Sequence, residues 1–513
     1  MKPAPLSCFC RWLAVAFLMS LCLWQSVKTA SPCVDLKGAY SYLFAWRSAA
    51  REAPQGKVGL LCNDADSISP IERSRMVAIA WERTSMPPVA VDKASDFDAV
   101  DCILSSAWVS RIAEARLKEC GFSLLSKNEY VKTWHRQGWS AVAHQDKASE
   151  VSRAREIFAL ILEFAATVLF LAIVLGRRGI GGCPLVASIA VATFLAFVAL
   201  SHPLLAPNGL GVYGGKAKLL FECGGVPDGF WASTQYAVLQ PSYPPGLTAL
   251  AYLHFALSGG CGDRLVQMLA VFAMLSLCIS LLQKSNRAAD ALPVVPYCLS
   301  PVAVRMSAGF YAEPFAALML VVGWIMLRRG KSLRGAAVMG LAGLFRLEAA
   351  FVAIAFAAGH CMLRGGFGEK LRVLLLAALP GFAWHIVCKA LGCGGPSDWN
   401  FASMPDIGNI AYASWVEVKS LSLHVIPVAA LALLVRPLRV LRAGPTLAIS
   451  LVPALLVFLA LPLACGFYSS PYSHWMIDNT IPRVVWYASA IPLLGLVASR
   501  RCATVDIYGG EGV

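Results

Sequence analysis

Apolar segments of similar length recur along most of the chain, separated by shorter polar stretches. Many of them approach the roughly 20 residues that an α-helix needs to cross the hydrocarbon core of a bilayer. This pattern predicts a polytopic α-helical membrane protein with about twelve transmembrane helices. The predicted spans lie near residues 12–24, 156–175, 183–201, 264–283, 291–308, 314–327, 335–349, 350–363, 371–389, 421–435, 445–465 and 484–499.

The N-terminal segment has the features of an export signal. Lys2 and Arg11 precede an apolar run from Trp12 to Trp24. This order is typical of a cleaved signal peptide that ends near Ala30, and equally of a signal anchor that remains as the first span. Both alternatives export the residues that follow.

Residues 31–150 are polar and charged, unlike the rest of the chain. Two short runs, VGLLCND (58–64) and DAVDCILSS (98–106), have the length and composition of buried strands. Helices are predicted after them, from Ile71 to Trp81 and from Val109 to Glu119. We therefore expect an extracytoplasmic α/β domain inserted between the first two spans. The predicted order is the signal at 1–30, the exported domain at 31–150, the membrane domain at 151–505 and a cytoplasmic tail at 506–513.

Composition and charge agree with a membrane protein. The chain is 58% hydrophobic and only 14% charged. Its formal charge of +14 is compatible with nucleic-acid binding, but Lys and Arg gather in short loops between apolar spans, which is the positive-inside pattern. We therefore expect no nucleic-acid partner and place these loops in the cytoplasm. They lie at residues 177–178, 284–287, 328–331, 364–370, 436–442 and 500–501.

One apolar stretch must stay on a single side for this topology to hold. Pro245–Leu257 is predicted to form an interfacial or re-entrant helix that starts at a Tyr-Pro-Pro turn, with Pro245 in its first turn. The polar loop 202–263 that contains it then lies on the exported face. The loops 390–420 and 466–483 lie there as well.

Four cysteines lie in the predicted exported domain. Of the 17 cysteines, Cys33, Cys62, Cys102 and Cys120 lie in the large polar segment. An oxidising compartment would allow one or two disulfides among them, although their spacing does not fix the pairing. The sequence offers no CxxC pair for a metal site.

Ionisable residues are predicted at one depth on the exported face. Glu313 begins a span, whereas Arg346 and Glu348 end another. Charged groups at membrane depth are costly, so they are usually functional or paired with one another. Two explanations stand side by side: a functional site, or a helix-terminal charge at Glu313 and a structural ion pair between Arg346 and Glu348.

Short motifs follow one another along this face: QPSYPPG (240–246), GFYAEP (309–314), GLAGLFRLE (340–348) and TIPR (480–483). In their order and shared face they resemble the C-type (GT-C) glycosyltransferase superfamily, integral membrane enzymes that take a sugar from a polyprenyl-phosphate carrier. The dolichyl-phosphate-mannose and aminoarabinose transferases are of this type. The resemblance covers roughly residues 180–500. It implies a GT-C-like fold and sugar transfer on the extracytoplasmic face.

The first exported loop departs from the family pattern. Family members commonly carry an early Asp, in a pattern like WDAxxxWxxKAK, as catalytic base or metal contact. Here PNGLGVYGGKAK has Asn208 at that place, and an amide does not accept a proton at neutral pH. Three alternatives follow: Glu222 or Asp228 substitutes for the Asp, Glu313 is the functional carboxylate, or the chain is catalytically impaired.

Transfer from a lipid phosphate needs a carboxylate that polarises the acceptor hydroxyl, with or without a divalent cation such as Mg²⁺ or Mn²⁺. The catalytic candidates are Glu313, Asp228 and Glu222, and Glu313 or Asp228 is the expected ligand of any cation. The leaving phosphate calls for cations, preferably arginine, whose fork pairs two oxygens. The predicted substrate-binding residues are Lys216, Arg346, Glu348, Arg483, Tyr243 and Asn208, with Tyr213, Trp231 and Tyr236 as further aromatic candidates for sugar stacking.

The resemblance implies a polyprenyl-phosphate-linked sugar donor and an acceptor that is an envelope glycan, a lipid or a protein. The apolar leader and the positive-inside bias favour a bacterial inner membrane, with membrane lipids around the spans. Two other classes stay open. One is a flippase or transporter of lipid-linked substrates, whose sites lie between broken helices near the bilayer midplane. The other is a non-catalytic relative, which Asn208 favours.

Overall fold

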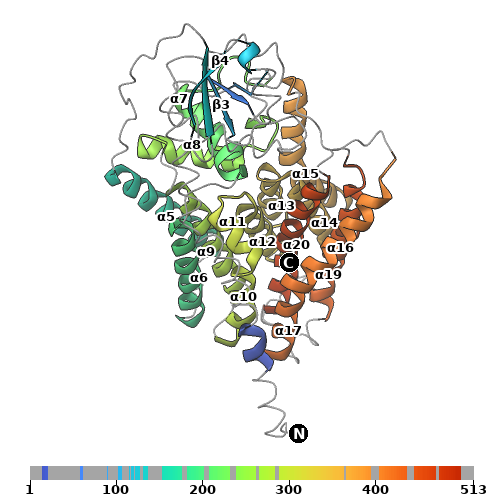
Figure 1. Ribbon diagram of the computed structural model, residues 1–513. Helices are drawn as coiled ribbons and strands as arrows, with labels where there is room; N and C mark the ends of the chain where they lie inside the picture. The colour runs from blue at the N-terminus through green and yellow to red at the C-terminus, as the bar shows by residue number, and fades with distance from the viewer. Residues whose placement is uncertain are drawn as a thin grey trace, which may run out of the picture.

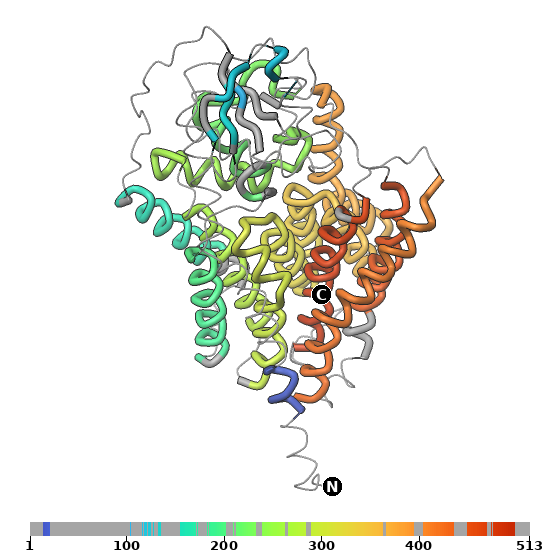
Figure 2. The backbone as a smooth tube through the Cα atoms, viewed as in Figure 1, coloured from blue at the N-terminus to red at the C-terminus, as the bar shows by residue number. Residues whose placement is uncertain are grey.

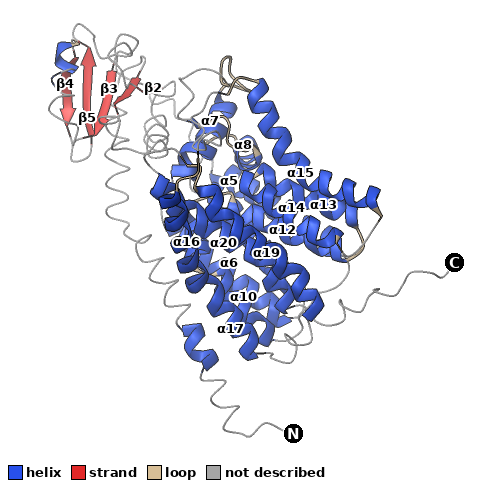
Figure 3. Cartoon of the chain, turned by 90° about the vertical axis from the view of Figure 1, so that its right-hand side faces the viewer, coloured by secondary structure: helices blue, strands red, loops and turns tan. Residues whose placement is uncertain are grey.

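A computed structural model shows a bundle of long helices with a small β-sheet beyond one end (Figure 1). The same end of the bundle carries α7 and α8, whereas α10 and α17 lie toward the other end (Figures 1 and 3). The structure describes residues 14–20, 58–61, 89–90, 102–106, 115, 117–120, 122–127, 131–136, 153–175, 182–201, 207–231, 239–261, 265–283, 288–362, 366–393, 404–435, 444–468 and 473–497.

The α-helices of the bundle follow one another with few long interruptions. They are α5 (Arg153–Leu175), α6 (Gly182–Ser201), α7 (Gly215–Glu222), α8 (Gly246–Ser258), α9 (Met268–Leu282), α10 (Ala291–Cys298), α11 (Pro301–Ala308), α12 (Glu313–Arg328), α13 (Ser332–Gly340), α14 (Leu347–Cys361), α15 (Phe367–Ala390), α16 (Ile407–Ser420), α17 (Ile426–Val435), α19 (Gly444–Cys465) and α20 (Ser473–Val497). A π-helix (Pro207–Gly214) leads into α7, and another (Leu421–Val425) joins α16 to α17. Residues 14–20 of the predicted first span are also helical.

The described residues contain five helices that are long and apolar enough to cross a membrane, and a sixth if α10 and α11, bent by 53°, form one span. The chain is therefore a helical membrane protein. The count of about twelve spans stays a prediction, because several predicted spans coincide with shorter apolar helices. The five helices are Pro184–Ser201, Leu265–Leu282, Phe367–Ala390, Ile407–Val435 and Met476–Val497.

Two helices begin earlier than predicted. The predicted exported loop 390–420 contains α16, which runs on through the π-helix into α17 as one apolar segment, Ile407–Val435. Similarly, α20 begins at Ser473 and includes Pro482, so that Arg483 lies on a helix rather than in a loop. Polar residues at the starts of both helices interrupt the apolar pattern, so hydropathy did not predict the first turns of either helix.

The predicted junction between the spans 335–349 and 350–363 was wrong by four residues. A 3₁₀ turn, Leu341–Leu344, ends α13, and the break falls at Arg346, whose backbone is extended (φ −148°, ψ 130°). Glycines explain the position of the break. A Cβ on Gly343 would lie 2.9 Å from the Cα of Gly381 in α15, so this turn packs directly against the backbone of α15.

The helix predicted after the Tyr-Pro-Pro turn is confirmed as α8. Pro245 occupies the N-cap, one position before the predicted first turn, and Gly259 ends the helix in the left-handed conformation (φ 75°). With 13 residues, α8 is shorter than the helices that pass for spans. Its interfacial placement stays a prediction.

The sheet has the strand order β2-β1-β3-β5-β4, with parallel pairing of β1 to β2 and β3 and antiparallel pairing in the remainder. The predicted strands in VGLLCND and DAVDCILSS are confirmed. The hairpin of β4 and β5 was not predicted, because Lys132, Thr133 and Trp134 are buried in succession and give no alternating pattern. The predicted helix 71–81 lies outside the described residues, and only the end of the one at 109–119 is described as helical. The strands are β1 (Val58–Leu61), β2 (Val89–Ala90), β3 (Cys102–Ser106), β4 (Phe122–Lys127) and β5 (Val131–Arg136).

The core of the bundle fixes helices that are distant in sequence. Figure 2 traces α12, α14 and α20 side by side, and residues of each helix contact the other two. Tyr297 of α10 stacks on Trp486 of α20 with ring centroids 5.2 Å apart. The two residues also exchange hydrogen bonds, Tyr297 Oη to the Trp486 carbonyl at 2.7 Å and Trp486 Nε1 to the Tyr297 carbonyl at 3.2 Å. This reciprocal contact holds α20 in place and with it Arg483.

Candidate functional site

The predicted charged residues of three separate motifs meet in one buried cluster, here called the carboxylate–arginine cluster: Glu313, Arg346, Glu348 and Arg483. Arg483 Nη1 donates to Glu313 Oε1 at 3.0 Å. Arg346 Nε lies 3.7 Å from the same oxygen, and its Nη2 donates to Glu348 Oε1 at 2.7 Å. The sequence separation of Glu313 and Arg483 is 170 residues, so the bundle itself assembles the cluster.

Local backbone geometry positions each side chain of the cluster. Glu313 is the first residue of α12 and follows a tight turn in which Phe310 is left-handed (φ 52°) and fully buried. Arg346 projects from the extended break before α14, and Glu348 lies in the first turn of that helix. On α20, Arg483 Nε donates to the Asn479 carbonyl one turn earlier, which fixes the direction of the guanidinium group.

The cluster is balanced in charge and almost closed to solvent. The side chain of Glu313 is 1% exposed, that of Arg346 8%, that of Arg483 12% and that of Glu348 24%. Two carboxylates offset two guanidinium groups, which is the arrangement that makes buried charges tolerable. One atom is left over. Glu313 Oε2 is buried and accepts no hydrogen bond within the described part of the chain.

Tyrosines surround the cluster on two sides. Tyr213 and Tyr243, which lie in the predicted exported loop 202–263, are edge to face with centroids 6.2 Å apart, and both interact electrostatically with Arg346. Burial raises the pKa of Tyr213 above its ordinary value, partly offset by Arg346. On the other side, the guanidinium carbon of Arg483 lies 5.3 Å from the ring centroid of Tyr311, a cation–π distance.

Lys216 contacts the rings of Tyr213 and Tyr243. The residue is 3% exposed, and its Nζ donates to the carbonyls of Gln240 at 3.3 Å and Tyr243 at 3.2 Å. The ammonium lies 5.7 Å and 5.9 Å from the ring centroids of Tyr213 and Tyr243. Burial lowers the pKa of Lys216 to about 7. The QPSYPPG turn is thus fastened to α7 by a lysine that titrates near neutrality.

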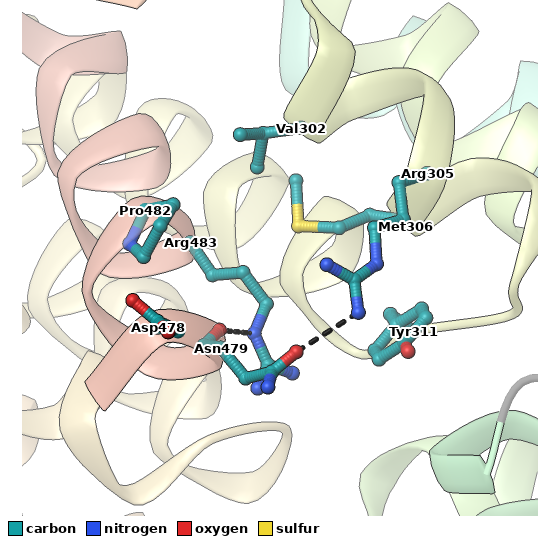
Figure 4. Close-up of a pocket in the computed structure, with 8 residues that line it drawn as sticks. All are labelled: Val302, Arg305, Met306, Tyr311, Asp478, Asn479, Pro482 and Arg483. Atoms are coloured by element: carbon teal, nitrogen blue, oxygen red, sulfur yellow. Dashed lines mark hydrogen bonds between the residues drawn. The ribbon is translucent and has the colours of Figure 1, made fainter. Parts of the chain in front are cut away.

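A small pocket adjoins the cluster and shares Arg483 with it, and Tyr311, which contacts Arg483, lines the pocket as well (Figure 4). Arg305 at its edge is exposed, and its Nη2 donates to Asn479 Oδ1 at 2.9 Å. In Figure 4 the guanidinium groups of Arg305 and Arg483 both approach Asn479. The pocket is lined by Val302, Arg305, Met306, Tyr311, Asp478, Asn479, Pro482 and Arg483.

The other predicted carboxylates form no ion pair with the cluster in the part of the chain that the structure describes. Glu222 is exposed at the end of α7 and lies 3.8 Å from Lys218. Asp228 is exposed in the turn that follows α7. The ring of Trp231 contacts Trp384 of α15 at 5.8 Å instead. Asn208 lies in the first π-helix, its side chain outside the described part, and Tyr236 lies outside the described residues.

Sequence reasoning missed Arg305, Tyr311 and Asn479 as site residues. Tyr311 could have been identified from its place in the GFYAEP motif. Asn479 could have been identified once α20 is extended to Ser473, because it then precedes Arg483 by one helical turn. No sequence pattern pointed to Arg305, because the bend between α10 and α11 brings it to the pocket.

A divalent cation fits poorly at Glu313. Two guanidinium groups already approach its carboxylate, and a doubly charged ion beside them is repelled. The described residues also contain no group of three His, Cys, Asp or Glu side chains that could hold a metal ion. Asp228, the other expected ligand, is exposed and lies apart from the cluster.

Comparisons with protein-family models, curated proteins and solved structures gave no match. The function must therefore be argued from the residues of the site and from the motifs that resemble the GT-C superfamily. Those motifs were identified separately in the sequence, yet their charged residues are neighbours in space.

Proposed function

We propose that this protein is a GT-C-like membrane glycosyltransferase that moves a sugar from a polyprenyl-phosphate carrier to an acceptor on the extracytoplasmic face. The observation that carries the proposal is the carboxylate–arginine cluster: Glu313, Arg346 and Arg483, each from a different motif, lie within ion-pair distance. Tyr243 of the fourth motif interacts electrostatically with Arg346 in the same cluster. Residues of four motifs that are separate in the sequence thus converge on one buried site.

Glu313 is the proposed catalytic carboxylate. Its Oε1 is held by two arginines, whereas the buried Oε2 is free to accept a hydrogen bond from an acceptor hydroxyl. The acceptor oxygen then attacks the anomeric carbon, the bond from that carbon to the phosphate oxygen breaks, and the hydroxyl proton passes to Oε2. None of these steps needs a divalent cation.

The phosphate of the donor is assigned to the pocket beside the cluster. Arg483 and Arg305 reach this pocket, whereas Arg346 is buried and engaged by both carboxylates. A phosphate there gains charge-assisted hydrogen bonds from two guanidinium groups. Arg346 then serves to position Glu313 and Glu348 and does not bind the donor itself.

The proposed setting is a bacterial inner membrane with the cluster on the exported side. Arg329 Nη2 donates to Gln283 Oε1 at 2.8 Å, so the ends of α9 and α12, each next to a predicted cytoplasmic loop, lie together. The donor sugar and the acceptor, an envelope glycan, a lipid or a protein, follow only from the resemblance.

A flippase of lipid-linked substrates is the second candidate. It is favoured by Glu417 and His424, which are buried within the apolar segment Ile407–Val435 and flank the start of the π-helix. Glu417 Oε1 and His424 Nδ1 have no hydrogen-bond partner among the described residues. Buried ionisable groups beside an irregular helix are typical of transport sites.

The test is a transfer assay on purified protein in lipid vesicles with a panel of polyprenyl-phosphate sugars. Release of the free lipid phosphate with any member of the panel supports the glycosyltransferase and identifies its donor. Donor binding without release, combined with movement of the donor between leaflets, supports the flippase instead and rejects transfer.

A further inference from the structure

The C-terminus of α15 brings two cysteines together. The amide of Cys393 donates to the Cys388 carbonyl at 3.0 Å, and the amide of Gly392 donates to the Lys389 carbonyl at 3.1 Å. Gly392 has the left-handed conformation (φ 69°) that this ending requires. These features define a Schellman motif, in which a side-chain contact often accompanies the backbone hydrogen bond between residues five positions apart. In this chain those two residues are both cysteines.

The thiols are placed for a covalent bond. An electrostatic interaction links the two thiols, and both residues are free cysteines. A disulfide needs Cα atoms about 4.4–6.8 Å apart, and a direct backbone hydrogen bond between the two residues favours such a separation. Cys388 is buried, whereas Cys393 is partly exposed, so a dissolved reagent has access to one sulfur.

The pair lies against the turn that carries Lys216. Cys388 Sγ is 3.8 Å from the Ser242 carbonyl, to which Trp384 Nε1, one helical turn earlier, donates at 3.0 Å. Ser242 lies between Gln240 and Tyr243, the two residues whose carbonyls accept from Lys216. The end of α15 therefore packs against the QPSYPPG turn.

We propose that Cys388 and Cys393 form a reversible disulfide that locks the end of α15 under this turn. The oxidant is a disulfide-bearing compound or protein of the exported compartment, a location that rests on the proposed function. The partly exposed Cys393 thiolate attacks that disulfide and releases one thiol, and the Cys388 thiolate then displaces the second from the mixed disulfide. The two cysteines lose two protons and two electrons, and the oxidant is reduced to two thiols.

A second pair of neighbouring thiols provides an internal comparison. The thiols of Cys278 of α9 and Cys298 of α10 also interact with each other, but both are fully buried in the bundle. A soluble disulfide has no access to either sulfur. This pair is expected to stay reduced under conditions that oxidise Cys388 and Cys393.

Peptide mapping of the full-length protein in lipid vesicles tests the proposal. The protein is treated with oxidised glutathione, its remaining thiols are blocked with N-ethylmaleimide under denaturing conditions, and it is digested with trypsin without reduction. Lys389 lies between the two cysteines, so cleavage after it leaves their peptides joined only through a disulfide. The expected product is this linked pair, which separates on reduction, while Cys278 and Cys298 carry the maleimide.

Cys393→Ser is the control, because its peptide retains the cleavage site and loses only the partner sulfur. Maleimide on both Cys388 and Cys393 of the oxidised wild type, or linkage of either to another cysteine, overturns the proposal. The readout does not involve transfer. A linked pair in a protein that transfers no sugar keeps the disulfide and rejects only the proposed function.

Discussion

At the scale of single residues, the site is defined by how Glu313 divides its two oxygens. One oxygen meets two guanidinium groups, and the other is buried without a partner in the described part of the chain. A buried acceptor atom that has no hydrogen-bond partner costs about 1–3 kcal/mol of free energy, so its presence needs an explanation. Binding of an acceptor hydroxyl supplies one. The two arginines also differ from each other, because Arg346 is enclosed whereas Arg483 reaches the pocket.

This difference predicts opposite phenotypes for the same substitution. Arg346→Lys cannot reach both carboxylates, so it lowers the thermal midpoint by several degrees. Arg483→Lys keeps a cation near Glu313 but loses the fork that pairs phosphate oxygens, so donor binding weakens about tenfold with a small change in stability. Thermal melting and donor binding of both purified variants check this. Equal effects of the two variants on both quantities would refute the division of roles.

Lys216 predicts a pH dependence of stability. Its folded pKa of about 7 lies below the value of about 10.4 in an unfolded chain. Between these values the unfolded state binds more protons, so this residue makes stability rise with pH above about 7. Lys216→Met removes the contribution. Melting temperatures at about pH 6 and about pH 9 should therefore differ less in the variant than in the wild type, and equal differences would show that Lys216 keeps its ordinary pKa.

At the scale of elements, glycine contacts place Arg346. Gly340 and Gly343 allow the turn after α13 to touch the backbone of α15, where a Cβ at either position would lie 2.3 Å or 2.9 Å from backbone atoms. The turn then ends in the extended residue that directs Arg346 to Glu313. From the sequence, hydropathy predicted two abutting spans here, but periodicity contains no information on which glycines meet a neighbouring backbone. The break was therefore placed at the wrong residue.

Gly343→Val is predicted to separate this turn from α15. The added methyl groups overpack the contact with Gly381 and Ala350, at a cost of about 1–3 kcal/mol. Because Arg346 moves with the turn, transfer falls as well. Gly366→Ala is the matched control, since a Cβ there meets nothing within 4 Å. Thermal melting and transfer by both variants test the prediction, and a stable, active Gly343→Val would contradict it.

At the scale of the whole molecule, the sequence predicted the class of the protein and the strands β1 and β3, because apolar length and β-propensity are local properties. It also identified as candidates the four charged residues that the structure brings together, Glu313, Arg346, Glu348 and Arg483, since charges are conspicuous in apolar surroundings. It did not predict that Asp228 and Glu222 lie apart from these four. That outcome depends on how α7 packs, which one sequence does not encode in any local pattern.

The proposed topology places the cluster and the basic loops on opposite sides of the membrane. An epitope inserted at Met404, which is 94% exposed, is expected to bind antibody in intact spheroplasts. An epitope at Lys331, in the predicted cytoplasmic loop 328–331, is expected to bind only after the membrane is permeabilised. Antibody access to both epitopes from the same side would refute this topology.

The central claim is that Glu313 acts in sugar transfer, and its most direct measurement is release of free lipid phosphate by wild type and Glu313→Gln in identical vesicles. The amide keeps the shape of the side chain but cannot take the acceptor proton, so release falls at least about 100-fold while expression and donor binding persist. Glu222→Gln, which changes an exposed carboxylate away from the cluster, leaves release unchanged. Undiminished release by Glu313→Gln would remove this residue from the mechanism and with it the proposed site.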